Sequence, residues 1–424
     1  MNRVWPRVAC LFATLGLACS SGTPLGSDPA PSGPAPTVSL SLGFGDAPVE
    51  GFVRLQPPAG GGSWSYSVDL NEDGSWDYQG RLDRELGYGY RFEPPGVHTV
   101  RVRLEGPDTL DAEREVVVND PGGITVTATG FVGRPDLGGG FEGITTSPDG
   151  TDVFVGAFDD GVLYRIDRAT LEVRDSIALG HGVEGLSVSP SGEFLFVAHK
   201  RPIAAFRVDL PDMKPASPSE GPPTDNFFAH ALDDQRALFG GEAPLVVYDV
   251  SLERIVARAL GPDGQELPFS GHFAVAPDGA TVVTAVVGGG GVLHVLGLPD
   301  LRPRGTWLLP QGTWIHAVAF AHDGKRLFVA GGGRLYVLDA RTGTIEKEFG
   351  VSIVGGVASP VARSRDGRFL AFEDVNGVLI VETERAIPLY RIAGHSSVAT
   401  DPSIDAGFVL LDIAGGLRTI TIGP

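Results

Sequence analysis

The chain has 424 residues, of which 60 are glycine and 33 proline, and its formal net charge is -19. This length suffices for two or three domains with a large core, and the glycine content favours many short strands joined by tight turns. The 52 Asp and Glu against 33 Lys and Arg argue against nucleic-acid binding, because a phosphate backbone requires a basic surface.

Residues 1–18 have the composition of a secretory signal peptide. Arg3 and Arg7 precede an apolar run that is too short to cross a bilayer as a permanent helix. The segment LGLAC, which ends at Cys19, resembles a bacterial lipobox. This resemblance implies a lipoprotein in which Cys19 becomes the lipidated first residue. The alternative is ordinary cleavage near Ala18 and release of the protein.

Residues 19–36 are rich in Ser, Gly and Pro, which predicts a disordered tether. Ser20 and Ser21 follow the cysteine in place of the Asp of an inner-membrane retention signal. The resemblance therefore implies export and a lipid anchor in the cell envelope, at the outer membrane. No cysteine occurs after Cys19, so neither a disulfide framework nor a thiolate metal site is predicted in the body of the protein.

Residues 37–120 are predicted to form a small β-sandwich. Polar and apolar residues alternate over 38–42 and again over 97–104, as in half-buried strands. The sequence YRFEPPGVHTVRVRL at 90–104 resembles the strand pair of PKD-like, immunoglobulin-type domains, with His98 in place of a tyrosine. That resemblance implies a domain used for extracellular spacing or adhesion.

A cluster of oxygen-bearing side chains inside this domain has the spacing of a calcium loop. The candidate ligands stand at alternate positions, and Gly74 permits a sharp turn between them. These candidate ligands are Asp69, Asn71, Asp73, Ser75 and Asp77. The twelfth position is Gly80 rather than a bidentate Glu, so a further ligand would come from Asp83 or Glu85. The alternative is an acidic surface turn that holds no ion.

Residues 121–424 contain a repeat of four short predicted strands. Its signature is a turn such as SPDG at 147–150, APDG at 276–279 or SRDG at 364–367. The reference positions are 149, 191, 233, 278, 323, 366 and 405, at intervals of 39 to 45 residues. Proline, aspartate and glycine suit successive places of such a turn, with glycine at positive φ. A period near 42 is typical of a β-propeller blade, and seven units predict seven blades.

The segment VFVGAFDDGVLYRIDRATLEV at 153–173 resembles the YVTN and WD40-like repeats of seven-bladed β-propellers, although no Trp-Asp dipeptide ends a blade. The last unit is short, and residues 417–422 have the pattern of its third strand. We expect residues 124–132 to supply its outer strand, which closes the ring and removes an exposed edge. The expected architecture is thus all-β, a small sandwich followed by a propeller closed by an N-terminal strand.

Seven residues before each reference turn position, or next to that place in the case of His272, polar side chains are expected at the mouth of the propeller channel. The candidate ligand-binding residues there are Glu142, Glu184, Asn226, His272 and His316. Such a ring could bind a divalent cation or a polar ligand, as in propeller lactonases and related hydrolases. Other histidines, such as His199 and His230, have other offsets from the turns, which favours turn or surface roles.

No pattern in the sequence places an acid, a base and a nucleophile in a fixed relation, so no catalytic residue is predicted. The function favoured by the sequence is non-catalytic binding of a protein or glycan at the cell envelope. The alternatives are a propeller hydrolase that uses a divalent cation at the channel mouth and a scaffold subunit of an envelope assembly. Calcium is the one expected cofactor, and a membrane is contacted through the lipid at Cys19.

Overall fold

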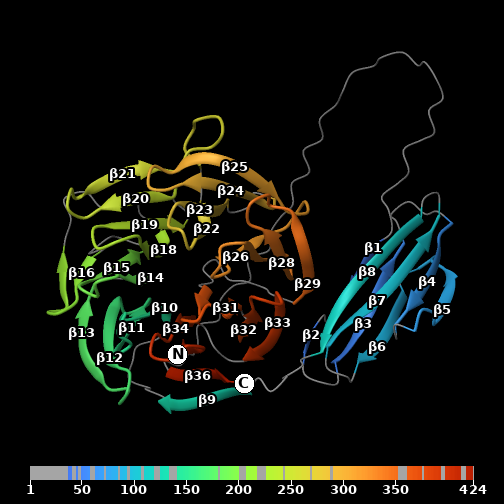
Figure 1. Cartoon of the computed structure of the whole chain (residues 1–424), viewed down its shortest axis with the longest axis horizontal. Helices are drawn as coiled ribbons and strands as arrows, with labels where there is room; N and C mark the ends of the chain where they lie inside the picture. The colour runs from blue at the N-terminus through green and yellow to red at the C-terminus, as the bar shows by residue number, and fades with distance from the viewer. Residues whose placement is uncertain are drawn as a thin grey trace, which may run out of the picture.

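A computed structural model gives the structure of the chain (Figure 1). It describes residues 37–40, 44–45, 49–57, 63–70, 73–84, 86–92, 96–106, 109–118, 125–132, 141–179, 182–199, 207–216, 226–241, 244–267, 270–286, 290–351, 361–374, 377–392, 397–411 and 417–423. Within these residues every regular element is a strand, which confirms the all-β class. The same residues contain no helix long and apolar enough to cross a membrane. The predicted signal peptide, tether and Cys19 lie outside them.

Two sheets precede the repeats. The first has the strand order β1-β3-β6, with β1 (Thr37–Leu40), β3 (Val49–Gln56) and β6 (Leu86–Phe92). The second has the order β2-β8-β7-β4-β5, with β2 (Phe44–Gly45), β4 (Ser65–Asp69), β5 (Tyr78–Arg81), β7 (Gly96–Glu105) and β8 (Thr109–Val118). Val53 of the first sheet and Val68 and Val102 of the second belong to one buried cluster. Strand β8 contacts β29 (Ile345–Gly350) of the following ring, and both β2 and β8 contact β33 (Ile387–Ile392).

Seven four-stranded antiparallel sheets follow, and Figure 1 shows them arranged in a ring, as in a β-propeller. Blade 1 holds β10 (Phe141–Thr146), β11 (Asp152–Ala157), β12 (Val162–Asp167) and β13 (Val173–Ala178). Blade 2 holds β14 (Val183–Val188), β15 (Phe194–His199), β16 (Arg207–Asp209) and β17 (Lys214–Ala216). Blade 3 holds β18 (Asn226–Ala231), β19 (Arg236–Gly241), β20 (Val246–Asp249) and β21 (Arg254–Arg258).

Blades 4 to 7 repeat this order. Blade 4 holds β22 (Ser270–Val275), β23 (Thr281–Val286), β24 (Val292–Gly297) and β25 (Arg302–Leu308). Blade 5 holds β26 (Ile315–Phe320), β27 (Arg326–Gly331), β28 (Arg334–Asp339) and β29 (Ile345–Gly350). Blade 6 holds β30 (Val361–Arg363), β31 (Phe369–Asp374), β32 (Gly377–Glu382) and β33 (Ile387–Ile392). Blade 7 joins β34 (Ser397–Thr400), β35 (Gly407–Leu411) and β36 (Leu417–Gly423) to β9 (Thr125–Val132), which pairs antiparallel with β36.

The predicted turns form where each inner strand meets the second strand, and their hydrogen bonds explain the repeated residue types. In blade 1, Ser147 Oγ donates to Asp149 Oδ1 at 2.6 Å and accepts the Asp152 N–H at 2.9 Å. The carboxylate of Asp149 also accepts the Thr151 N–H at 3.0 Å. Gly150 has φ +74°, so the predicted positive φ is confirmed at this turn. We call this end of the channel the turn face and the opposite end the mouth.

The core of the ring lies between blades rather than within them. Successive residues of a strand point to opposite faces of its sheet. In β11, Phe154 therefore packs in a cluster with blade 2, while Val153 and Val155 pack with residues of blade 7. Similar clusters join blades 2 and 3, 3 and 4, and 4 and 5, and one large cluster joins blades 5, 6 and 7. Each blade is thus stabilised by its two neighbours.

The outer strands differ from the inner ones because one edge of each has no strand beside it. In β13 and β25 most side chains are intermediate or exposed, and both strands carry charged residues. Three outer strands contain a proline at the same register, namely Pro215, Pro303 and Pro388, which pair with Val208, Leu296 and Val381. Proline lacks an N–H, so edge strands and bulges are the places in a sheet that accept it.

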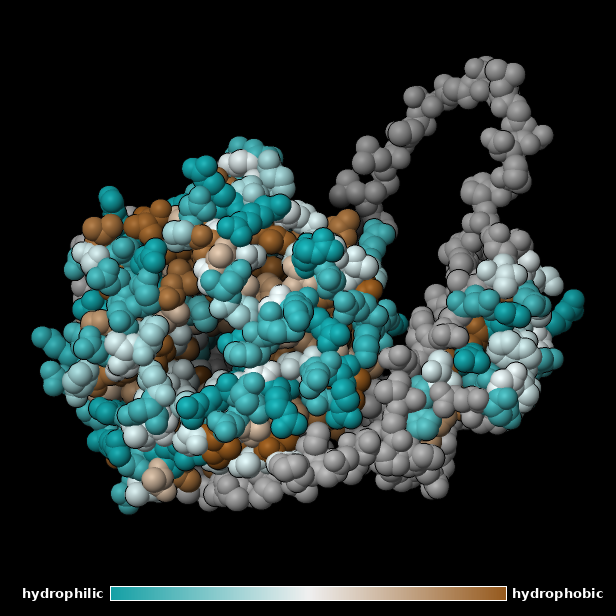
Figure 2. Space-filling model, in the orientation of Figure 1, coloured by the Kyte–Doolittle hydropathy of each residue, from teal (hydrophilic) through white to brown (hydrophobic). Residues whose placement is uncertain are grey.

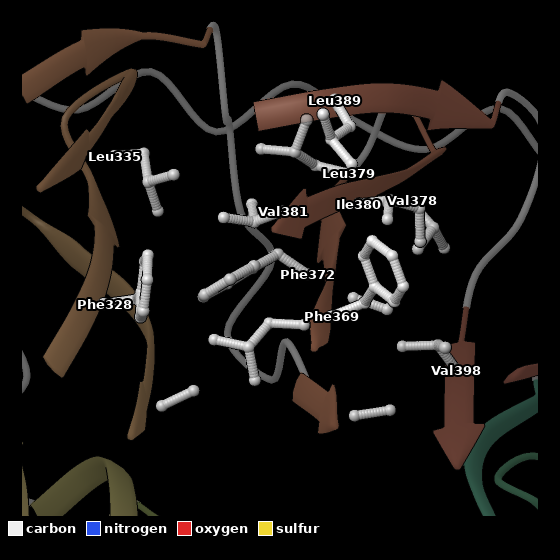
Figure 3. Packing of buried hydrophobic residues seen from close by; sticks show 14 of the residues in the cluster. Phe328, Leu335, Phe369, Phe372, Val378, Leu379, Ile380, Val381, Leu389 and Val398 are labelled. Atoms are coloured by element: carbon white, nitrogen blue, oxygen red, sulfur yellow. The ribbon is translucent and has the colours of Figure 1, made fainter. Parts of the chain in front are cut away.

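We predict that Phe328→Ala strongly destabilises the ring. Phe328 is completely buried and lies near Leu335 in the cluster shared by blades 5 and 6 (Figure 3). Removing the ring leaves a cavity that the neighbouring blade cannot fill, so we expect a loss of about 3–5 kcal/mol in the free energy of unfolding. Urea denaturation measures this loss. As a control, Leu252→Ala removes a side chain that is 53% exposed and should change stability by less than about 0.5 kcal/mol. Equal effects of both substitutions would contradict the prediction.

Candidate ligand-binding channel

The inner strands of the seven blades surround a central channel that contains a cavity of about 310 Å³. Every blade contributes to its wall through β10, β14, β18, β22, β26, β30 or β34. Much of the wall is apolar, with Ile144, Leu186, Phe228, Val318 and Val398 among its residues. Seven of the described side chains in it can ionise or hydrogen-bond, and they are Thr145, Thr146, Glu184, Ser187, His230, His272 and Thr400. The channel therefore offers a ligand both apolar contacts and several polar partners.

Two glycines allow the inner strands to approach closely around this cavity. A Cβ on Gly143 would lie 2.1 Å from the carbonyl oxygen of Glu184, and one on Gly185 would lie 2.5 Å from that of Phe227. Real Cβ atoms do not approach oxygen so closely, so any larger residue would push neighbouring blades apart. The two glycines thus hold the backbone of blades 1, 2 and 3 together at the channel wall.

His272 is 5% exposed, and its ring lies 5.1 Å from that of Phe228. Burial, with a smaller contribution from the charge of His316, lowers the pKa of His272 to about 3. Burial also lowers the pKa of His316, which is partly buried. Both histidines are therefore neutral near pH 7 and could act as hydrogen-bond partners or ligands rather than as charges.

The structure brings together part of the predicted ring at the mouth. Glu184 and His272 both line the 310 Å³ cavity, and His316 influences the pKa of His272 without lining that cavity. Glu142 and Asn226 lie on β10 and β18, but their side chains are outside the described residues. Among the side chains that are described, no three His, Cys, Asp or Glu are grouped so as to hold a metal ion. A ligand role for the five residues stays a prediction.

The sequence predicted a turn or surface role for His230, and the structure places it on β18, where it lines the channel cavity. Arg363, which the sequence did not single out, lies at the turn face on β30 and lines a second cavity together with His230. His230 in blade 3 and Arg363 in blade 6 both stand three residues before the reference turn position of their blade. That shared offset is the signal that could have found the pair.

Four of the five predicted calcium ligands are described, Asp69 at the end of β4 and Asp73, Ser75 and Asp77 before β5. Asp73 Oδ1 accepts the Ser75 N–H at 2.8 Å and the Ser75 hydroxyl at 2.5 Å, while Asp77 Oδ2 accepts the Leu70 N–H at 2.7 Å. Asp69 is 1% exposed, and Asn71 is outside the described residues. The described carboxylates thus cap the turn through their own hydrogen bonds, and the calcium site stays a prediction.

Comparison with known proteins shows the propeller fold. No protein-family model matches the chain, and no curated protein matches it. The propeller domain of Cps50 (Swd1) from Myceliophteria thermophila is similar at 15% identity and a TM-score of 0.55, over 70% of this chain and 100% of that domain. Kuenenia stuttgartiensis hydrazine synthase is similar at 16% identity and a TM-score of 0.54, over 68% of this chain and 96% of that one. At such identities the likeness establishes the β-propeller alone.

We predict that His272 makes the protein less stable in acid. The unfolded chain binds a proton at the ordinary histidine pKa of about 6.5, whereas the folded chain does not until about pH 3. This difference in pKa contributes to the free energy of unfolding. The contribution is complete above pH 6.5 and decreases as the pH falls, by at most about 1.4 kcal/mol per pH unit. Urea denaturation at pH 7.5 and 5 should show a smaller decrease for His272→Gln than for the wild type. Equal decreases would contradict this assignment.

Thermal melting tests the calcium prediction. Added calcium should raise the Tm of the wild-type protein, EDTA should reverse the increase, and Asp73→Ala should remove it because that residue stands in the centre of the proposed ligands. Asp212→Ala, which changes an exposed carboxylate in blade 2, serves as the control. A wild-type Tm that is the same in calcium and EDTA would disprove the site.

Proposed function

We propose that this protein is a non-catalytic binding protein of the cell envelope whose propeller presents its mouth to a protein partner. The observation that carries the proposal is an exposed apolar pair at the mouth. Trp314 is 62% exposed and Leu308 is 69% exposed, and they stand at the two ends of the connection from blade 4 to blade 5. Exposed tryptophans are enriched among the residues that dominate protein interfaces.

The backbone at this connection is held in place, which favours binding. The Gly332 N–H donates to the Trp314 carbonyl at 3.0 Å, and the Leu309 N–H donates to the Gly291 carbonyl at 2.8 Å. Thr313 Oγ1 donates to the Pro310 carbonyl at 2.7 Å. A residue on a fixed loop loses little conformational entropy on binding, so Trp314 is suited to insert into an apolar pocket.

A protein fits this pair better than a glycan does. Leu308 offers aliphatic surface at the other end of the same connection, and a large partner with apolar side chains could contact both residues. The net charge of -19 would also speed association with a basic partner. Elsewhere hydrophilic residues cover much of the face seen in Figure 2.

The enzyme alternative has weaker support. In the described part of the 310 Å³ cavity, Glu184 is the one carboxylate and His272 has a pKa too low for a general base at neutral pH. A propeller hydrolase would need a further acid or a metal-binding group beside them. The scaffold alternative differs from the main proposal only in the number of partners.

The proposal includes the domain formed by the N-terminal sheets and the way in which the ring is closed. The two N-terminal sheets, with their common cluster, would form the PKD-like β-sandwich, and β9 would close the ring through its pairing with β36. The sandwich and the tether would then space the propeller from the outer membrane, to which the lipid at Cys19 holds the chain. The lipobox resemblance supports this location.

Site-specific cross-linking in the native envelope tests the proposal. A photo-crosslinking residue in place of Trp314 should form an adduct with one protein, and the same residue in place of Val256, exposed on blade 3, should not. Trp314→Ala should reduce recovery of that partner by tenfold or more, as is typical of a hot spot. Cys19→Ala should release the protein from the membrane fraction. Adducts of equal yield at both positions, or a polysaccharide adduct at position 314, would overturn the proposal.

A further inference from the structure

The turn face holds a second cavity, of about 350 Å³, between blades 3 and 4. The described residues of its wall are apolar or basic, and no Asp or Glu is among them. Blade 3 contributes His230, Ala231, Leu232 and Arg236, blade 4 contributes Val275, Ala276, Pro277, Gly279, Leu298 and Pro299, and blade 6 contributes Arg363. A basic, acid-free cavity is unexpected in a chain with a net charge of -19.

The two arginines of this cavity differ in how their charges are compensated. Arg236 forms an ion pair with Asp233, with 2.7 Å between Nη2 and Oδ2. Arg363 forms no ion pair with any carboxylate of the described residues, although it is partly buried and burial lowers its pKa. A guanidinium stays protonated in a protein, so its charge here calls for an anion.

Arg363 is also the one residue of this wall that comes from outside blades 3 and 4. It lies on β30 of blade 6, across the channel from β18, and its charge contributes to the low pKa of His230. Its backbone is fixed, because Thr400 Oγ1 donates to the Arg363 carbonyl at 2.7 Å. The guanidinium is therefore directed at a cavity that neighbouring blades build.

We infer that this cavity binds a small monocarboxylate with an apolar body, whose carboxylate pairs with Arg363 and hydrogen-bonds to His230. A planar carboxylate matches the two-pronged donor geometry of a guanidinium. The apolar body would contact Val275, Leu298 and Pro299 of the same wall.

The charge balance selects a monoanion over a dianion. Asp233 already neutralises Arg236, and His230 is neutral at pH 7 because desolvation, with the charge of Arg363, lowers its pKa to about 4. His230 remains accessible from the channel although protein surrounds it, so a ligand can reach its ring. One uncompensated positive charge is left, which one carboxylate neutralises and a dianion would exceed.

Isothermal titration calorimetry of the full chain at pH 7 with hexanoate tests the inference. Hexanoate should bind saturably with one site per chain. Arg363→Met should weaken binding tenfold or more, since a charge-assisted hydrogen bond is lost. Arg365→Met removes an exposed guanidinium two residues away and should keep the wild-type affinity. Hexanamide, which lacks the charge, and inorganic phosphate, which lacks the apolar body, should each bind at least tenfold more weakly.

A second variant tests the same cavity in case the Arg363→Met protein does not fold. Val275→Phe narrows the cavity without changing charge and should also weaken hexanoate binding tenfold or more. Absence of saturable binding to the wild type, or equal affinity for phosphate and hexanoate, would overturn the inference. So would wild-type affinity in a folded Arg363→Met or Val275→Phe protein.

Discussion

The structure of the ring depends on apolar packing between the faces of neighbouring sheets. No blade encloses a core of its own, because each sheet is one layer thick and alternates its side chains between two neighbours. The cluster that joins Ile144 and Val153 of blade 1 to Ala399 and Val409 of blade 7 completes the sequence of contacts around the ring. The channel, the mouth and the turn face all acquire their geometry from this packing.

Turn chemistry and the repeat period made the fold predictable. Serine, aspartate and glycine at fixed places determine where each inner strand ends, and the observed bonds of Ser147, Asp149 and Ser364 match that logic. The pattern at residues 417–422 likewise corresponds to β36. The turn residues and the strand pattern each lie within a few consecutive residues, so they can be read from a single sequence.

The channel was harder to predict, for two physical reasons. Inner strands carry register irregularities near the mouth, between Phe141 and Gly143, Asn226 and Phe228, and Ile315 and Ala317. A bulge changes which side chains point into the channel, so counting seven residues back from a turn does not preserve their direction. Arg363 and His230 come from blades 6 and 3; both stand three residues before a reference turn position, but that offset does not say which two blades bring their side chains to one cavity.

The prolines and charges of the outer strands have a consequence for proteins crowded at a surface. An open strand edge offers free N–H and C=O groups to any similar edge, and many copies of a propeller held close together would present seven such edges each. A proline at the centre of β17 and at the second position of β25 and β33 interrupts the donor row, and the charged side chains of β13 and β25 would have to lose their hydration to pair with a second copy. The blades can thus be densely packed side by side without joining into continuous sheets, which protects them from fibril formation.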